Sequence, residues 1–247
     1  MSNSASSQVN QADQKPPPPD PTCEDLKKKN TEQRDQVARN LRAREDELNQ
    51  EERLTLEKAE GTRMTFSSIF STIPGAGGTM TACSSGCAQA CSPNELQVGG
   101  TSEMKMGLKK DIRESTDPAY DDAKDKAGVL CDSSYVHPGG GKGAHAEPKL
   151  LNQLSNDSPD SPMRGGKILL SIDWRFNKGG KQDSSGMPCQ SCYKMLCHAA
   201  KKCDIKVFIC DKDGNEQPFP EDCENPTSYS DLSTRVDGYP QPGRNPQ

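Results

Sequence analysis

"KILLSIDWRF", residues 167–176, is the clearest strand in the chain and decides the fold class. One face of this strand is apolar throughout, made of Ile168, Leu170, Ile172, Trp174 and Phe176. The alternation with the opposite face, which carries Ser171, Asp173 and Arg175, is typical of a half-buried strand.

The segments on either side extend this strand into an α/β pattern. "HAEPKLLNQL" (145–154) predicts a helix before it, and "PCQSCYKMLCHAAKKC" (188–203) predicts a second helix after it. "IKVFIC" (205–210) predicts a second strand, and Asp213-Gly214 is a turn that folds a further strand back antiparallel. The order helix, strand, helix, strand, hairpin predicts an α/β sandwich, in which a mixed sheet is flanked by helices.

The chain as a whole is less apolar than a chain that is globular throughout. Of its 247 residues only 30% are hydrophobic and 4% aromatic. Residues 1–21 and 224–247 carry Pro, Gly and polar residues, which bury too little apolar surface to offset chain entropy. We expect both ends to be disordered, and we place the folded, catalytic domain at residues 101–223.

Two further segments lie before that domain. Residues 22–60 predict one long charged helix, started by a capping box of Thr22 with Asp25 and best explained as a solvated or connecting arm. Residues 61–100 are rich in Gly, Ser and Cys and predict a linker. Cys83, Cys87 and Cys91 are spaced four apart there, and small buried or idle thiols are favoured over a metal site.

The cysteine count bears on where the chain works. Eleven cysteines, with no export signal at the amino terminus, favour thiols and metal ligands over a disulfide framework. No apolar run approaches 18 residues, so no membrane span is predicted. We expect a cytoplasmic protein, or one exported without a cleavable signal peptide to act in a target cytosol.

A histidine, a glutamate and two cysteines carry the chemistry that the sequence predicts. Cys189 and Cys192 follow Pro188 at a helix start and share one helical face, where the helix amino terminus favours thiolates. A catalytic zinc ion needs three protein ligands and an open position, and His145 is the natural third ligand. Glu147 lies two residues on, before Pro148, so we expect it at or before the helix start, converging on the same point.

The motifs His-Ala-Glu (145–147) and Pro-Cys-Gln-Ser-Cys (188–192) resemble the cytidine deaminase superfamily, over roughly residues 101–223. Within it the chain looks most like bacterial polymorphic-toxin deaminases. The resemblance implies a deaminase-type three-layer sandwich, with His145, Cys189 and Cys192 as Zn²⁺ ligands and Glu147 as the proton shuttle. It also implies a two-stranded hairpin before the first motif, for which "GVLCDSSYV" (128–136) is the candidate, and last strands that run antiparallel.

The implied activity is zinc-dependent hydrolytic deamination of a nucleobase. Residues 142–206 carry eleven Lys or Arg against six Asp or Glu, a balance of +5 that permits a phosphate-bearing partner and that a solvated surface explains as well. Cytosine in DNA or RNA is the first choice of substrate, and a free nucleoside or nucleotide is the second. If the chain is a toxin effector, an immunity protein is expected to cover the pocket.

Two other interpretations keep the metal and change the function. Cys189, Cys192, His198 and Cys203 fall one residue short of the spacing of a zinc knuckle, although this segment is helix-forming sequence without glycine. The second interpretation is a deaminase-like module that uses zinc only for stability and binds nucleic acid without catalysis. Glu147 argues against it, because a structural zinc site has no use for a carboxylate beside an open position.

Overall fold

A computed structural model of the chain describes residues 19–62, 64–84, 127–131, 133–136, 145–157, 163–178 and 181–238. In chain order, the elements are α1 (Cys23–Arg42), η1 (Glu45–Glu47), α2 (Gln50–Glu60), β1 (Thr65–Ile73), β2 (Ala76–Cys83), β3 (Ala127–Leu130), β4 (Ser133–Val136), α5 (Ala146–Asp157), β5 (Lys167–Lys178), β6 (Lys181–Ser185), α6 (Gln190–Lys202), β7 (Lys206–Cys210), β8 (Glu216–Pro218) and α7 (Ser228–Asp237). Residues 1–18 and 239–247 of the two ends predicted to be disordered lie outside the described residues.

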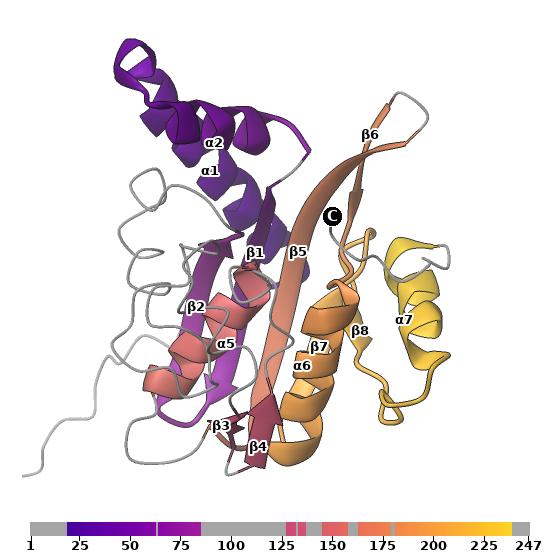
Figure 1. Cartoon of the computed structure of the whole chain (residues 1–247). Helices are drawn as coiled ribbons and strands as arrows, with labels where there is room; N and C mark the ends of the chain where they lie inside the picture. Colours follow the sequence, from indigo (N-terminus) through magenta and orange to yellow (C-terminus); the bar gives the residue numbers. More distant parts are fainter. Residues whose placement is uncertain are drawn as a thin grey trace, which may run out of the picture.

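One mixed sheet forms the centre of the molecule (Figure 1). Its strand order is β2-β1-β5-β7-β8, and β6 also pairs with β5. β5 is antiparallel to β1 and parallel to β7, and β8 returns antiparallel to β7. β3 and β4 pair with each other in a separate small sheet. The architecture is mixed α/β, with an open sheet flanked by helices, and is compatible with the predicted sandwich.

The β1–β2 hairpin occupies the segment that the sequence predicts to be a linker. Ile73 pairs with Ala76, so the two-residue turn Pro74-Gly75 joins the strands, with Gly75 at φ 79°. The linker prediction is therefore wrong for residues 65–83. β1 is covered on both faces, and its buried positions include the serines at 67, 68 and 71. Because these buried residues are polar, the sequence of β1 lacks the apolar pattern by which a strand is predicted.

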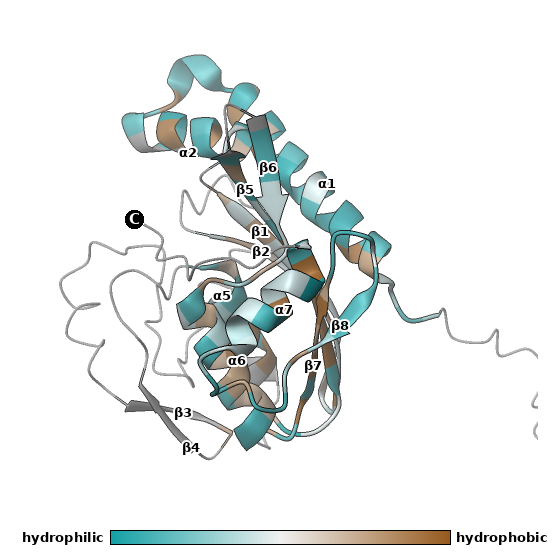
Figure 2. Ribbon diagram, turned by 90° about the vertical axis from the view of Figure 1, so that its right-hand side faces the viewer, coloured by the Kyte–Doolittle hydropathy of each residue, from teal (hydrophilic) through white to brown (hydrophobic). Residues whose placement is uncertain are grey.

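Helices cover both faces of this sheet. On one face, Ile69 of β1 belongs to the main apolar cluster together with Leu150 of α5 and Leu196 of α6. On the opposite face, Phe66 of β1 packs in a second cluster with Val37 of α1. Figure 2 shows α1 coloured mostly hydrophilic and β7 mostly hydrophobic, as this layering requires.

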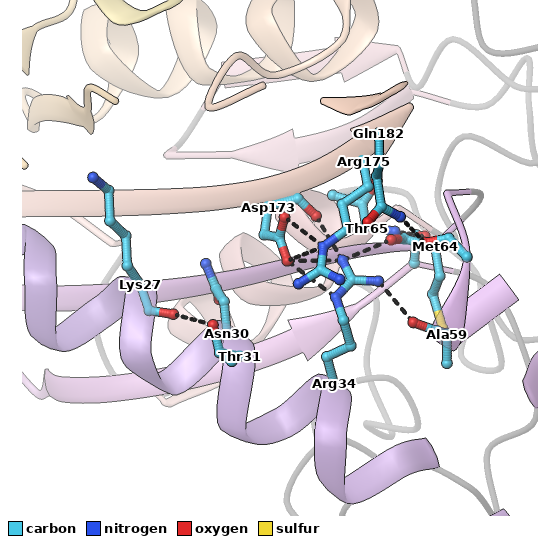
Figure 3. Close-up of polar contacts among 12 residues, drawn as sticks. Lys27, Asn30, Thr31, Arg34, Ala59, Met64, Thr65, Asp173, Arg175 and Gln182 are labelled. Carbon is cyan, nitrogen blue, oxygen red and sulfur yellow. Dashed lines mark hydrogen bonds and ion pairs between the residues drawn. The ribbon is translucent and has the colours of Figure 1, made fainter. Parts of the chain in front are cut away.

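The charged segment 22–60 is two helices and not one. The Thr22–Asp25 capping box is confirmed at the start of α1. A second capping box, formed by Asn49 with Glu52, starts α2 after a short 3-10 turn, and α2 packs back against α1. The prediction of a solvated arm is wrong for α1, because Arg34 is only 3% exposed and reaches the sheet (Figure 3).

The segment after residue 223, predicted to be disordered, contains a packed helix. Leu232 and Val236 of α7 are fully buried in the main apolar cluster. The Asp237 carboxylate accepts a hydrogen bond of 2.6 Å from Ser185 Oγ and another of 3.0 Å from the Gly186 amide. Tyr229, Leu232 and Val236 lie at helical spacing (i, i+3, i+7) and are the buried hydrophobic residues of this otherwise polar helix.

Disulfide bonds correct the expectation of free thiols. The structure pairs Cys23 with Cys210, Cys131 with Cys203, and Cys197 with Cys223. The three pairs are separated by 187, 72 and 26 residues in sequence. Which cysteines meet depends on the tertiary fold, and the count alone carries no information on pairing.

Candidate metal centre

Two helix starts form the candidate centre. His145 immediately precedes α5, and its carbonyl accepts the first helical hydrogen bond, 3.4 Å from the Lys149 amide. Cys189 is the N-cap of α6 and Cys192 lies in the first turn, where the Tyr193 amide donates to the Cys189 carbonyl at 2.8 Å. α5 and α6 lie on the same face of the sheet and contact each other, so their amino-terminal ends meet.

The predicted side chains converge although 44 residues separate His145 from Cys189. His145 Nδ1 lies 3.5 Å from Cys189 Sγ and 3.4 Å from Cys192 Sγ. One ligand atom from each of the three residues lies within 4.8 Å of the others. Glu147 joins them, because Cys192 Sγ lies 3.7 Å from Glu147 Oε2.

The local path at Glu147 differs slightly from the expectation. α5 begins at Ala146, so Glu147 and Pro148 stand in its first turn, whereas His145 stands before it. Proline is tolerated there because its missing N–H would have no helical partner. His145 is half-buried and Glu147 is 4% exposed, so the carboxyl group faces the interior and not bulk solvent.

Burial and close contact shift the acidities of the centre. Burial, helped by the negative charge of Cys189, raises the pKa of Glu147 to about 7 against the opposing effect of His145. Hydrogen bonds from Cys192 and His145 lower the pKa of Cys189 to about 4. Burial raises the pKa of Cys192 well above its ordinary value. Without a metal ion, the lowered pKa of Cys189 favours its thiolate form, and the raised pKa of Glu147 favours its protonated form.

The donor set suits a zinc ion. One imidazole nitrogen and two cysteine sulfurs, grouped within 4.8 Å, are the ligand types that zinc takes in proteins. Three protein ligands would leave a tetrahedral ion one position for a further ligand, and the carboxyl group of Glu147 lies 3.7 Å from the Cys192 sulfur. His145, Cys189 and Cys192 could hold a metal ion.

Residues that the sequence did not single out form hydrogen bonds with the loop of residues 186–189, which leads into α6. The Tyr229 hydroxyl donates to the Pro188 carbonyl at 2.9 Å, just before Cys189. The Met187 amide donates to Ser185 Oγ at 3.1 Å, and that hydroxyl in turn donates to Asp237. Tyr229 and Asp237 belong to α7, within the segment predicted to be disordered, so no sequence signal pointed to them.

The other cysteines within the described residues do not join the centre. Cys203 is the C-cap of α6 and is bonded to Cys131, so the zinc-knuckle set of Cys189, Cys192, His198 and Cys203 is excluded. Cys83 ends β2 and is buried in the cluster beneath α1 with Phe66. Cys87 and Cys91 lie outside the described residues.

Comparison of the chain with protein-family models, curated proteins and solved structures finds no match. Within the described ranges, no helix has the length and apolar character needed to cross a membrane.

Proposed function

We propose that the chain is a zinc-dependent hydrolytic deaminase that acts on a nucleobase, with cytosine in nucleic acid as its substrate. One observation carries the proposal: His145 Nδ1 lies within 3.5 Å of both cysteine sulfurs, and Glu147 is buried beside them. A metal with three protein ligands, an open position and an adjacent carboxyl group is the arrangement that hydrolytic deamination requires.

The fold around the site supports the proposal. The deaminase resemblance implies a two-stranded hairpin before the His-Ala-Glu motif and antiparallel strands at the end. The β1–β2 hairpin precedes α5, and β8 runs antiparallel to β7. The hairpin predicted at 128–136 is present as β3 and β4, and the β1–β2 hairpin of residues 65–83 is a second one before α5, so the proposed domain extends back to include β1.

Each residue of the site has a role in the proposed reaction. His145, Cys189 and Cys192 hold the metal, and a zinc ion supplies Lewis-acid activation of water. Glu147 takes the proton of the attacking water, and its carboxyl group then gives protons to the ring nitrogen and to the departing ammonia. Burial raises the pKa of Glu147, which favours the return of a proton from its carboxyl group to the substrate.

The choice of a nucleic acid substrate depends on charge. The span 142–206, which contains α5, β5 and α6, carries five more basic than acidic residues. Such a surplus attracts phosphates, whereas residues 207–223 have one Lys against five acids and do not.

The test is expression of the wild-type chain and Glu147→Ala in a bacterium that lacks uracil repair, followed by sequencing of genome and transcripts. An excess of C-to-T changes in the genome with wild type alone supports DNA cytosine, and changes confined to transcripts support RNA. Glu147→Ala is the matched control, because it leaves the three metal ligands in place.

Absence of changes in both pools would contradict a nucleic acid substrate. Ammonia release by the purified chain from free cytidine or a nucleotide would then support the second substrate class. Zinc binding without ammonia release from any of these substrates would contradict the enzyme and support a module that only binds.

A further inference from the structure

The three disulfide bonds indicate that the described fold forms under oxidising conditions. Each joins a pair of elements distant in sequence: Cys23 of α1 with Cys210 of β7, Cys131 beside β3 with Cys203 after α6, and Cys197 of α6 with Cys223 after β8. Disulfides form and persist where thiols are oxidised, and they are rare in a reducing cytosol. The cysteines that are not in these disulfides are therefore exposed to the same oxidant.

Those remaining thiols are not equivalent. The described cysteines outside the three disulfides are Cys83, Cys189 and Cys192, and all of them are buried. Cys189 and Cys192 share the group of atoms that lie within 4.8 Å of one another, and Cys83 does not belong to that group. Cys83 packs against Phe66 in the cluster beneath α1, on the other face of the sheet. Among the described thiols, Cys189 therefore has Cys192 as its one possible partner.

The position of Cys189 at the start of α6 brings its sulfur toward Cys192. Cys189 is the N-cap, with extended backbone at φ −66° and ψ 164°, and Cys192 is the third residue of the helix. A side chain at an N-cap turns back over the first turn and reaches the third helical residue, which is how capping residues act. A Cys-x-x-Cys pair in this place is reactive toward disulfides.

We propose that Cys189 and Cys192 form a redox-sensitive pair, which closes to a fourth disulfide when no metal ion is bound and is protected from oxidation when one is. This inference rests on the proposed metal centre and adds a form of regulation to it. The pair is the only part of the candidate centre that can exist in two covalent states, because His145 and Glu147 do not take part in thiol exchange.

Closure of the pair is a balanced exchange with a low-molecular-weight disulfide such as oxidised glutathione. The Cys189 thiolate attacks one glutathione sulfur, a mixed disulfide forms, and one glutathione thiolate leaves and takes up a proton. Cys192 then gives up its proton and attacks the Cys189 sulfur, and the second glutathione leaves, takes up that proton and becomes a thiol. The two cysteines are oxidised by two electrons, and one oxidised glutathione is reduced to two molecules of the thiol.

Oxidation and metal binding exclude each other. The metal needs both sulfurs as free thiolates, and the disulfide takes both away, so His145 is left as the sole ligand of the set. A sulfur held by the metal is in turn not available to attack a disulfide. An oxidising compartment without metal therefore inactivates the centre, whereas one that supplies metal preserves it.

The test compares the full chain, with its three structural disulfides intact, in zinc-loaded and chelator-treated form. Both samples are incubated with oxidised glutathione, the remaining thiols are alkylated, and peptides are mapped by mass spectrometry. We expect a Cys189–Cys192 disulfide in the chelator-treated sample alone, together with loss of its ability to take up zinc. A Cys189–Cys192 disulfide in both samples, or in neither, would overturn the inference.

Two variants and a second readout complete the experiment. Cys192→Ser in metal-free form is expected to accumulate a glutathione adduct at Cys189, because the resolving thiol is missing, whereas Cys83→Ser is expected to behave as wild type. Ammonia release is measured on the zinc-loaded, unoxidised chain. Its absence contradicts the proposed deaminase and leaves the redox result standing, so the two failures can be told apart.

Discussion

Arg34 of α1 and Asp173 of β5 form an ion pair across 139 residues of sequence, with Nη2 2.8 Å from Oδ2 (Figure 3). The guanidinium also donates to the carbonyls of Ala59 at 3.0 Å and Met64 at 3.2 Å, and it lies 4.4 Å from the centre of the Phe66 ring. One side chain thus joins α1, the end of α2 and two strands. Burial lowers the pKa of Arg34, and the Asp173 carboxylate opposes that shift.

Arg34→Met is expected to lower the free energy of unfolding by about 3–5 kcal/mol, because it leaves the two buried carbonyls without their donor and Asp173 with Arg175 as its remaining ionic partner. Urea denaturation followed by circular dichroism measures the change. The control is Lys28→Met on the same helix, which removes a pair whose side chains are 76% and 61% exposed and should have no measurable effect. Equal losses in the two variants would refute a structural role for Arg34.

Glu147→Gln is expected to lower kcat for ammonia release by about 10²–10⁴-fold, because the amide cannot accept the proton of water. Zinc content, measured by atomic absorption, should remain that of wild type. His145→Ala should instead lose both zinc and activity, since it removes one of the three ligands. A Glu147→Gln variant that loses its metal would show that the carboxylate is a ligand and not the proton shuttle.

Asp211 stabilises the turn between β7 and β8 in a pH-dependent way. Burial raises the pKa of this carboxyl group, but hydrogen bonds from the backbone of Asn215 and the side chain of Gln217 outweigh burial and lower it below 3.8. A lowered pKa in the folded state means that the stabilisation is complete above the unfolded value of 3.8 and is lost as the pH falls through the folded value.

Asp211→Ala should therefore cost about 1–3 kcal/mol at neutral pH, and the difference from wild type should shrink below about pH 4. Chemical denaturation over this pH range is the measurement. A difference that stays constant down to about pH 2 would show that the carboxylate charge contributes nothing.

Gly166 lies where the chain enters β5 close to the end of β1. It has φ 79°, and a Cβ atom there would lie 2.8 Å from the Thr72 carbonyl oxygen. Its neighbour Gly165 has φ 71° but open space around the same position, which makes it a matched control. Gly165→Ala should cost about 1–2 kcal/mol for its backbone conformation, and Gly166→Ala about 1–3 kcal/mol more for the clash. Equal thermal shifts in the two variants would contradict this.

The elements that the sequence predicts correctly are those whose signal is local. β5 alternates in hydrophobicity, α6 begins two residues after Pro188, and the strands β7 and β8 flank the Asp213-Gly214 turn. The candidate centre was predicted for the same reason, because each half is a short motif at a helix start. The two halves meet because α5, which precedes β5, and α6, which follows it, pack on the same face of the sheet.

What the sequence does not predict depends on contacts between distant segments. β1 lacks apolar alternation because α1 buries its second face, where Ser68 donates to Asn30 at 2.6 Å. That burial is evident only when α1 is in place, and α1 resembles a solvated helix until Arg34 is seen to reach Asp173. The disulfide partners are likewise known only from the fold, since eleven cysteines permit many pairings.

The disulfide bond between Cys23, the first residue of α1, and Cys210, the last of β7, limits where the chain can be truncated. A fragment begun at residue 101, as motif boundaries alone suggest, would omit two strands and the helix that shields the back of the sheet. Such a fragment should be insoluble, with Cys210 left unpaired. Any shortened version has to start upstream of Cys23 and retain α7.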